Sequence, residues 1–293
     1  MDNPKFLAMV SPKGGQFRPA VCRHLELEFN RAGLELVFHY IESDSGLRAA
    51  IDQSLIDGCN LFLAIGGDGT VSRVAGCLHG KPHTLGIIPV GTANTLARML
   101  GISMNLEKAA KTAAAMKKTR SVDGMKVGDR LCLLNVSAGV SSLSLDGLDA
   151  AQKAATGMLA YVIGAAKATL KIAPCDYEIT LDGHTFNTRA VEIHVTNIGA
   201  IGVPQYHLYE KSHIDDGNVE VLVISRWTPQ KIVDTVLDLV LRRRKRAIRF
   251  IGGGSAIAIN CTQVMPVQGD GDIIGVTPVS ITVLPQAVNF IVG

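Results

Sequence analysis

Hydrophobic residues in the first part of the chain alternate between short continuous runs and stripes with helical spacing. The continuous runs predict buried strands at residues 6–10, 34–40, 61–65 and 85–88. Between and after them, apolar residues three and four positions apart predict helices that begin near residues 19, 47, 70 and 95. Strands that alternate with helices in this way are typical of a parallel sheet with helices on both faces.

The pattern changes after Asp123, where short strand-like runs with turn residues between them replace the alternation. Runs of this kind fall at residues 131–140, 177–181, 191–196, 219–224, 256–259, 279–284 and 288–292. Two helical stripes, at 156–172 and 229–244, interrupt them. The chain is therefore expected to form two domains, an α/β domain at 1–123 and an antiparallel β-sandwich domain at 124–284.

Composition and charge favour a soluble protein and argue against several classes. Of 293 residues, 47% are hydrophobic, which is enough for a packed core, and the net charge of +3 is too small to indicate nucleic-acid binding. No apolar run reaches the roughly 18 residues of a membrane-spanning helix, and Phe6–Val10 is too short for a secretory signal. The six cysteines form no C-x-x-C pair, so buried thiols in a cytoplasmic protein are expected.

One run of positive charge, Arg242–Arg246, leaves two interpretations open. Cations suit the carboxyl end of a helix, where they are solvated and interact with the helix dipole. The same run would also attract an anionic membrane surface or a phosphorylated ligand. A cytoplasmic protein with peripheral contact at the inner membrane face is one expectation, and a homodimer is compatible with the sequence.

The strand at 61–65 leads directly into a glycine-rich loop that opens a helix, Gly66-Gly67-Asp68-Gly69-Thr70. Glycines allow the backbone to approach a ligand closely, and Thr70 is expected to cap the helix. The first amides of a helix favour anions, so the loop is suited to phosphate. Asp68 would repel a phosphate unless a cation lay between them, and it therefore indicates a divalent metal such as Mg²⁺.

Two further loops of small residues are expected at the same edge of the sheet. They are Gly91-Thr92-Ala93-Asn94, after the strand at 85–88, and Ser11-Pro12-Lys13-Gly14-Gly15, after the strand at 6–10. Ligands bind at the carboxyl ends of the strands in open α/β sheets, so three such loops favour phosphate binding over a purely structural role. No G-x-x-x-x-G-K-[ST] and no helix-opening G-x-G-x-x-G is present, which argues against a P-loop protein and a dehydrogenase.

Carboxylates gather in two Asp-Gly segments of the second domain. Asp215 and Asp216 precede a glycine and a predicted strand, and Asp270 and Asp272 flank Gly271. Each segment alone is typical of an ordinary turn. Together with the phosphate-binding loops they favour phosphoryl transfer, which needs a metal and a group that orients the attacking hydroxyl.

Taken in order, these motifs resemble the diacylglycerol and sphingosine lipid kinase family. The matching segments are GGDGT (66–70), PVGTANTLAR (89–98), Asp123, LNVSAGV (134–140), IDDGNVEV (214–221) and GDGD (269–272). GGDGT alone also occurs in NAD kinases, whereas the later segments separate the two families. The resemblance covers nearly the whole chain and implies an ATP-binding α/β domain, to which residues 285–293 return, and a β-sandwich domain.

The resemblance also assigns roles to single residues on the nucleotide side. It implies a nucleotide-binding set made of Ser11, Gly66, Gly67, Asp68, Gly69, Thr70, Val71, Ser72, Gly91, Thr92 and Asn94. It further implies that Asp68, with Asp123 acting through water, holds the catalytic Mg²⁺. ATP and Mg²⁺ are therefore the expected cofactors.

On the acceptor side, the resemblance implies a second, structural Mg²⁺. Asp216 would be its ligand, helped by backbone carbonyl groups near His213 and Asn218. The D-G-acid turn would supply catalytic carboxylates, with Asp272 as the general base and Asp270 beside it.

The chain departs from the family pattern at three positions. Ser11 stands where the family prefers Asn, and Asp272 replaces Glu, which keeps the carboxylate but shortens its reach. Thr95 stands where an Asp usually follows Asn94, and it removes one negative charge from the expected metal network.

The expected activity is transfer of the γ-phosphoryl group of ATP to a hydroxyl of a diacylglycerol, a sphingoid base or a related lipid-like alcohol. Thr95 motivates one alternative, a non-catalytic regulator that binds lipid or nucleotide on the same fold. An NAD kinase-like activity is the other alternative.

Overall fold

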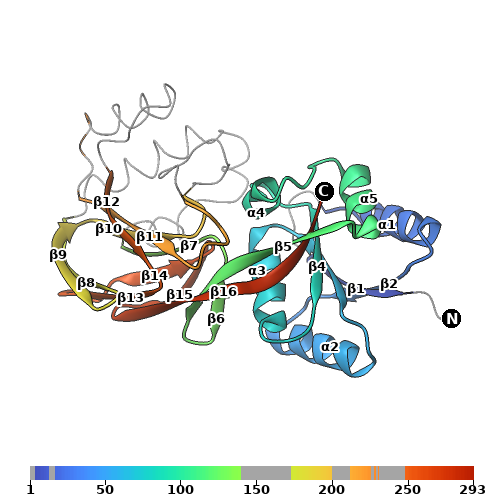
Figure 1. The fold of residues 1–293 in the computed structure, drawn as a ribbon, viewed down its shortest axis with the longest axis horizontal. Helices are drawn as coiled ribbons and strands as arrows, with labels where there is room; N and C mark the ends of the chain where they lie inside the picture. The colour runs from blue at the N-terminus through green and yellow to red at the C-terminus, as the bar shows by residue number, and fades with distance from the viewer. Residues whose placement is uncertain are drawn as a thin grey trace. The chain divides into compact units, whose positions relative to one another are not determined.

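The computed structural model describes residues 4–12, 17–139, 173–199, 212–225, 228, 230 and 248–293. Within it the chain divides into two compact units, shown in Figure 1. Unit 1 comprises Met1–Gly124 and Pro285–Gly293, and unit 2 comprises Met125–Leu284. Apart from residue 230, the helices expected at 156–172 and 229–244, and the basic run at 242–246, lie outside the described residues.

Unit 1 is built on a parallel sheet in the strand order β2-β1-β3-β4-β16. Its strands are β1 (Lys5–Val10), β2 (Glu35–Tyr40), β3 (Leu61–Gly66), β4 (Thr84–Pro89) and the last part of β16 (Val279–Val292). Its helices are α1 (Pro19–Arg31), α2 (Asp44–Ile56), α3 (Asp68–Leu78), α4 (Thr95–Met99) and α5 (Leu106–Ala115). The predicted parallel sheet with interleaved helices is confirmed.

The helices of unit 1 cover both faces of this sheet. In Figure 1, α1 and α5 lie together on one side, whereas α2 lies with α3 on the other. The predicted helical stripe of α3 is confirmed, because its apolar residues Val71, Val74, Ala75 and Leu78 are all buried. Phe6 of β1 and Phe29 of α1 pack edge to face, with ring centroids 5.1 Å apart.

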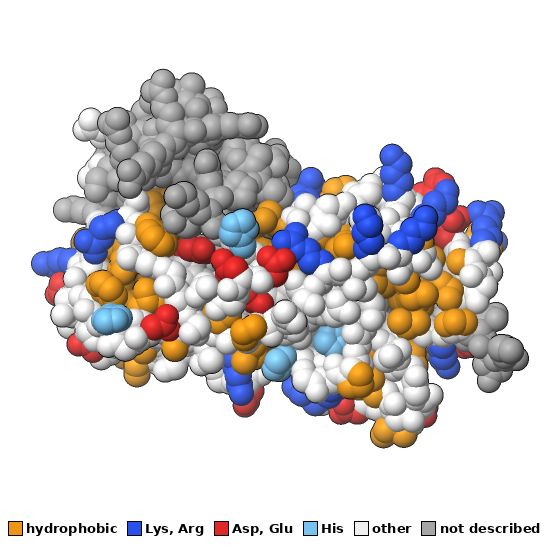
Figure 2. Space-filling model, in the orientation of Figure 1, with side chains coloured by type: hydrophobic (Ala, Val, Ile, Leu, Met, Phe, Trp, Pro, Cys, Tyr) orange, Lys and Arg blue, Asp and Glu red, His pale blue; other side chains and the backbone are white. Residues whose placement is uncertain are grey.

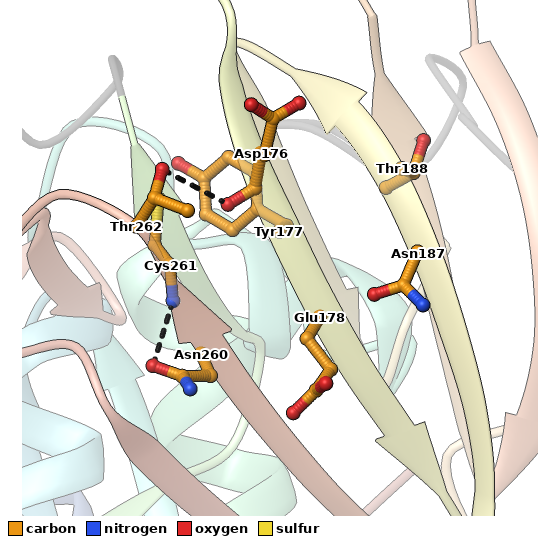
Figure 3. A pocket seen from close by; sticks show the side chains of 8 residues that line it. All are labelled: Asp176, Tyr177, Glu178, Asn187, Thr188, Asn260, Cys261 and Thr262. Carbon is orange, nitrogen blue, oxygen red and sulfur yellow. Dashed lines mark hydrogen bonds between the residues drawn. The ribbon is translucent and has the colours of Figure 1, made fainter.

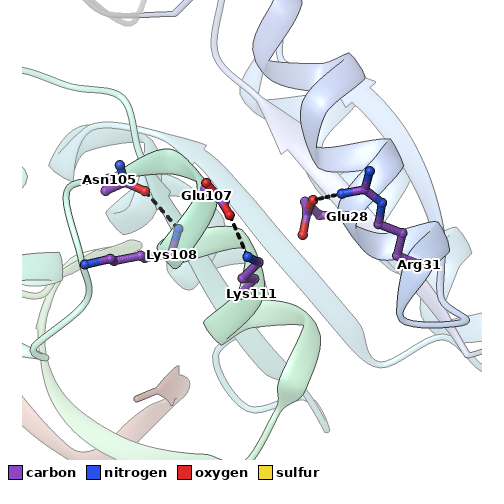
Figure 4. A network of polar contacts seen from close by, with 6 residues as sticks. All are labelled: Glu28, Arg31, Asn105, Glu107, Lys108 and Lys111. Carbon is purple, nitrogen blue, oxygen red and sulfur yellow. Dashed lines mark hydrogen bonds and ion pairs between the residues drawn. The ribbon is translucent and has the colours of Figure 1, made fainter.

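Helices α1 and α5 each carry a charged pair, of which Glu28 is buried and the other members are exposed. Figure 4 shows the ion pairs between Glu28 and Arg31, at 2.6 Å, and between Glu107 and Lys111, at 2.5 Å. The Lys111 ammonium lowers the pKa of the Glu107 carboxyl through a hydrogen bond. Asn105 caps α5, because its side chain accepts a hydrogen bond from the backbone of Lys108. Lys and Arg side chains gather on this part of the surface in Figure 2.

Unit 2 is a β-sandwich, as predicted from its short strands. One of its layers is a six-stranded antiparallel sheet, which we call sheet B, in the order β12-β11-β10-β7-β14-β15. Its strands are β7 (Asn135–Gly139), β10 (Glu192–Thr196), β11 (Val219–Ile224), β12 (Ile248–Gly254), β14 (Pro266–Gly269) and β15 (Asp272–Val276). The other layer pairs the start of β16 with β13 (Ala256–Cys261), β8 (Cys175–Leu181) and β9 (His184–Ala190).

Two further strands lie at the junction of the units in sequence. β5 (Lys118–Val127) runs across the boundary at residue 124 and forms a hairpin with β6 (Arg130–Cys132). Strand β16 passes from unit 2 into unit 1 at residue 285. Strands β5 and β16 therefore each contribute residues to both units.

The core of unit 2 takes alternate residues of its strands. Val136, Ile193 and Val221 of sheet B belong to one buried cluster with Tyr177 and Ile257 of the other layer. The residues between them therefore point to the opposite side of sheet B, which we call its outer face. All five residues of β10 are nevertheless buried, so the outer face is covered as well as the core face.

The six cysteines are all free, and four of them are buried. Burial raises the pKa of the thiols of Cys22, Cys77, Cys132 and Cys175. This fits the expectation of reduced thiols, although Cys59 and Cys261 are only half-buried. Among the helices that the structure describes, none is long and apolar enough to cross a membrane.

Candidate functional site

The carboxyl ends of three neighbouring strands meet at one edge of the unit 1 sheet. The amide of Ser11, just after β1, donates a hydrogen bond to the carbonyl of Ile65 at 3.0 Å. The amide of Val90, just after β4, donates to the carbonyl of Gly66 at 3.1 Å. The three loops singled out from the sequence therefore begin side by side, as predicted for a ligand-binding edge.

The two glycine loops touch backbone to backbone. A Cβ atom on Gly67 would lie 3.1 Å from the Cα of Gly91, and a Cβ on Gly91 would overlap the backbone of Gly67. Asn94 closes the second loop: its side chain accepts from the amide of Gly91 at 3.0 Å and donates to the carbonyl of Gly91 at 2.9 Å. Asn94 itself has a φ of 48°, in the left-handed region. The glycines are therefore required by this close approach.

The start of α3 leaves its first-turn amides without a side-chain cap. The helix begins at Asp68, Gly67 occupies the capping position, and no side chain accepts a hydrogen bond there. The expectation that Thr70 caps the helix is wrong, because the helix begins two residues earlier and the Thr70 amide donates to the carbonyl of Gly67. A Cβ on Gly69 would meet nothing within 4 Å, so the backbone is open at this point. Uncapped amides at a helix start are suited to an anion.

Asp68 joins the starts of two helices. Its carboxylate oxygens accept hydrogen bonds from the amides of Thr95, at 2.9 Å, and Leu96, at 3.0 Å. Asp68 therefore supplies the negative charge at the start of α4, where the helix dipole favours it. The side chain is half-buried, and a carboxylate with about four lone-pair sites still has two for a cation or a water.

Asp123 lies deeper in unit 1. It is 1% exposed, and its Oδ1 accepts a hydrogen bond from the amide of Gln286 at 2.7 Å. Gln286 has a φ of 50°, so Asp123 holds a constrained turn of β16. The structure thus gives Asp123 a structural contact that the sequence did not suggest, and its metal role stays a prediction.

In unit 2, Asp270 and Gly271 form the two-residue turn between β14 and β15. Their φ angles of 50° and 97° and the pairing of Gly269 with Asp272 are those of a type I′ hairpin turn. The carboxylate of Asp270 accepts three backbone hydrogen bonds, from Leu133 (2.7 Å), Leu134 (2.9 Å) and Asn135 (3.0 Å). Asp270 therefore fixes the hairpin to the start of β7.

Asp272, the expected general base, follows this turn as the first residue of β15. Its side chain is exposed, so it is accessible to an acceptor. The clamp made by Asp270 is two residues away along the chain. The geometry therefore presents Asp272 on a hairpin whose position is fixed from behind.

The residues expected to hold a structural Mg²⁺ lie in the turn before β11. Asp216 accepts a hydrogen bond from the amide of Asn218 at 3.0 Å, and the side chain of Asn218 donates to the carbonyl of Asp216. His213, Asp216 and Asn218 are all exposed. In the described ranges, no three or more His, Cys, Asp or Glu side chains form a metal-binding group. Mg²⁺ commonly binds through one or two carboxylates with waters and phosphates, so single aspartates fit it.

A cavity elsewhere in unit 2 contains none of these residues. Figure 3 shows this cavity, of about 290 Å³, on strands β8, β9 and β13. Its lining consists of Asp176, Tyr177, Glu178, Asn187, Thr188, Asn260, Cys261 and Thr262. It is therefore separate from the residues with predicted roles.

Two family models match consecutive parts of the chain. Residues 5–127 match the diacylglycerol kinase catalytic domain family, and residues 134–292 match the YegS C-terminal NAD kinase beta sandwich-like domain family. A diacylglycerol kinase of Bacillus subtilis is 26% identical over 280 residues, which cover 92% of this chain and 90% of that protein. A protein of Synechocystis is 26% identical over 277 residues, 91% of this chain but only 62% of that protein.

Solved structures agree on the fold. A Bacillus anthracis structure covers 100% of this chain and 96% of its own, with a TM-score of 0.83 and 23% identity. A second structure, of a diacylglycerol kinase from the same organism, covers 100% and 98%, with a TM-score of 0.75 and 21% identity. The chain therefore belongs to the lipid kinase family that joins a diacylglycerol kinase catalytic domain to a YegS C-terminal NAD kinase beta sandwich-like domain.

Proposed function

We propose that the chain transfers the γ-phosphoryl group of ATP to a hydroxyl of a lipid or lipid-like alcohol in a Mg²⁺-dependent reaction. The diacylglycerol kinase catalytic domain family implies use of ATP. The observation that carries the proposal is the contact between Gly67 and Gly91 beside the uncapped start of α3. Two glycine loops held this closely, next to free helix amides, suit a polyphosphate chain.

In this proposal unit 1 binds the nucleotide. The amides of Gly67, Asp68 and Gly69 at the start of α3 would face the phosphates, and the open space at Gly69 lets them approach. Thr92 is exposed in the second loop, where its hydroxyl can contact the nucleotide. Ser11 completes the edge after β1.

Magnesium would be held by single carboxylates on each unit. The Asp68 carboxylate would bind the ion through the lone pairs that do not accept from the amides of Thr95 and Leu96. Asp123 would act on the ion through water. Asp216, with backbone carbonyls near His213 and Asn218, would hold the structural ion. A Mg²⁺ held there would supply positive charge that neutralises part of the charge of the phosphates.

Asp272 would accept the hydrogen of the acceptor hydroxyl. Because the transition state of phosphoryl transfer is loose, the proton can leave late, and the carboxylate mainly orients the hydroxyl. Asp270 would be a positioning residue, because three backbone amides already occupy its carboxylate.

The substitution Asp272→Asn tests this assignment. Turnover of ATP with a lipid acceptor should fall at least about 100-fold, as expected for loss of a general base. Nucleotide binding and the free energy of unfolding should not change. Asp129→Asn, in the exposed turn between β5 and β6, is the matched control. Unchanged turnover in Asp272→Asn would remove Asp272 from the mechanism.

Thr95 supports a second candidate, a regulator that binds nucleotide or lipid without catalysis. Its side chain is 3% exposed at the start of α4, where the family pattern has a further carboxylate. Labelled ATP with Mg²⁺ and a panel of diacylglycerol, sphingoid base and NAD separates the three candidates. Product on a lipid supports the kinase, product on NAD supports an NAD kinase-like activity, and bound ATP without product supports the regulator.

A further inference from the structure

The outer face of sheet B carries a continuous row of polar residues. Gln268 of β14 lies opposite Ser137 of β7, and Ser137 lies opposite His194 of β10. The next row joins Asn135 of β7, through Thr196, to Glu220 of β11. These positions alternate with core residues along each strand, so their side chains share the outer face.

Three buried atoms of this face make no hydrogen bond. They are Oδ1 of Asn135, Nε2 of His194 and Oε1 of Gln268. His194 is only 8% exposed, so water does not readily replace the missing partner. Buried polar atoms are almost always hydrogen-bonded, because an unpaired one has lost its water partner and destabilises the folded chain. Three of them on one face of one sheet indicate a site that a ligand completes.

All three atoms can accept a hydrogen bond, so each needs a donor as its partner. The two amide oxygens are acceptors only. The Nδ1 of His194 lies 3.5 Å from a carboxylate oxygen of Glu192, and a proton there leaves Nε2 as a third acceptor. Gln268 and His194 sit on either side of β7, about 10 Å apart at the usual strand spacing. A complementary ligand therefore offers several hydrogen-bond donors over that span.

Other residues of the face add negative charge and little apolar surface. Glu192 and Glu220 are 7% and 5% exposed, and the hydroxyl of Ser212 donates a hydrogen bond to Glu220. Leu222 continues the row beyond His194. The face is thus better suited to a polar group than to an alkyl chain.

The row is physically continuous with the proposed base. The amide of Asn135 donates to the carboxylate of Asp270, and the amide of Asp270 donates to the carbonyl of Asn135 at 3.0 Å. Asp272 follows two residues later. A group bound against Asn135 would therefore be near the end of β7 that the hairpin of Asp272 holds.

We propose that Asn135, His194 and Gln268 bind the polar head group of the acceptor through donors on that group, either hydroxyls or an ammonium. The proposal rests on the kinase function proposed above, and it names these three as specificity-determining residues. An acceptor with additional donors beside the reacting hydroxyl would be preferred over one with a single hydroxyl.

Binding without ATP tests the site separately from catalysis. The probes are monooleoylglycerol, with two hydroxyls, and oleylamine, with an ammonium, each in detergent micelles. The variants Gln268→Met and Asn135→Leu keep the volume of the side chain and remove the acceptor atom. Gln263→Met, at an exposed position of the same unit, is the matched control. We expect the preferred probe to bind about tenfold more weakly to both variants than to the wild type. Binding to the control variant should equal that of the wild type.

Thermal unfolding supplies a second readout. Replacing an unpaired buried acceptor with an apolar group of similar shape should raise the midpoint of the ligand-free chain. Weaker probe binding in both variants with an unchanged or raised midpoint supports the site. A change in binding of less than threefold, or a wild-type chain that binds neither probe, overturns it.

The two proposals fail in different ways. A chain that binds a probe through these residues but phosphorylates no lipid keeps the site and rejects the kinase. A chain that phosphorylates monooleoylglycerol with the same KM in wild type and in both variants keeps the kinase and rejects the site.

Discussion

The backbone amide of Thr95 donates a hydrogen bond of 2.9 Å to the carboxylate of Asp68, so the first residue of α3 also holds the start of α4. Leu96 donates to the other oxygen of the same carboxylate. One side chain therefore links the two loops that are proposed to bind phosphate. Its charge stabilises the start of α4, and mutation can separate this effect from the proposed metal role.

Asp68→Asn removes the charge and keeps the shape. The free energy of unfolding should fall by about 1 kcal/mol, because an amide is a poorer partner for two helix-start amides. Phosphoryl transfer should fall at least about 100-fold if Asp68 faces the metal. Urea unfolding and steady-state kinetics measure the two effects.

Asp44→Asn is the control for this change, since Asp44 is also the acidic first residue of a helix. It lies at the exposed start of α2 in an ion pair with Arg73 and should cost less than about 1 kcal/mol with full turnover. Equal turnover losses in both variants would contradict a specific role for Asp68.

Thr95→Asp restores the carboxylate of the family pattern next to Asp68. Without metal, two close carboxylates repel each other at a nearly buried position, and the free energy of unfolding should fall by about 1–2 kcal/mol. With Mg²⁺ and ATP the loss should shrink, because a cation between them is favourable. Thermal unfolding of Thr95→Asp with and without Mg²⁺ measures this. An unfolding midpoint that does not change when Mg²⁺ is added would contradict a metal at Asp68.

Gly91→Ala and Gly69→Ala separate loop packing from ligand approach. The added methyl group at Gly91 overlaps the backbone of Gly67, and we expect a loss of about 2 kcal/mol or more. At Gly69 the methyl group meets nothing, and helix propensity should make the variant neutral or up to about 1 kcal/mol more stable.

ATP binding by Gly69→Ala is the informative measurement of this pair. The methyl group points into the open space at the start of α3, so nucleotide affinity should fall although stability does not. Undiminished ATP affinity in a stable Gly69→Ala variant would place the phosphates elsewhere.

The sequence predicts those helices and strands whose buried positions are filled by large apolar side chains. The apolar residues of α3 have helical spacing, and those of β1, β3 and β4 form continuous runs, so each pattern predicts the element that the structure has. α5 was missed, because its buried stripe consists of Ala109, Ala110 and Ala113, which give little hydrophobic contrast. β9 was also missed, since most of its residues are exposed and pairing with β8 alone makes it a strand.

The same limit applies to the site. The glycine loops were placed correctly at one edge because chain order and strand direction decide this. The hydrogen-bond partners of Asp270 lie 135 to 137 residues away in sequence, so no local sequence pattern predicts them. Asn135, His194 and Gln268 come from three strands, and only the register of these strands shows that the residues share one face.

Asp270→Ala should destabilise the chain far more than Asp272→Asn. Three backbone amides lose their acceptor, and we expect a loss of about 2–4 kcal/mol in the free energy of unfolding. Asp272, exposed and one residue beyond the turn, should cost less than about 0.5 kcal/mol. Urea unfolding of both variants at one pH measures the difference, and equal stabilities would contradict the clamp.

Glu220 should make stability depend on pH. Burial raises the pKa of its carboxyl, the nearby Asp216 adds to the shift, and the hydrogen bond from Ser212 opposes it. The folded chain then binds the proton more tightly than the unfolded chain. The free energy of unfolding should therefore fall as pH rises from the ordinary Glu range through the raised pKa of the folded state.

Glu220→Gln removes this titration and keeps an acceptor for Ser212. Relative to wild type, the variant should gain stability as the pH rises from 4 to 7, because only the wild type must bury a charge at the higher pH. Urea unfolding of both chains at several pH values gives the difference directly, since the other groups cancel. A difference that stays constant across this range would show that Glu220 ionises as easily in the folded chain as in the unfolded one.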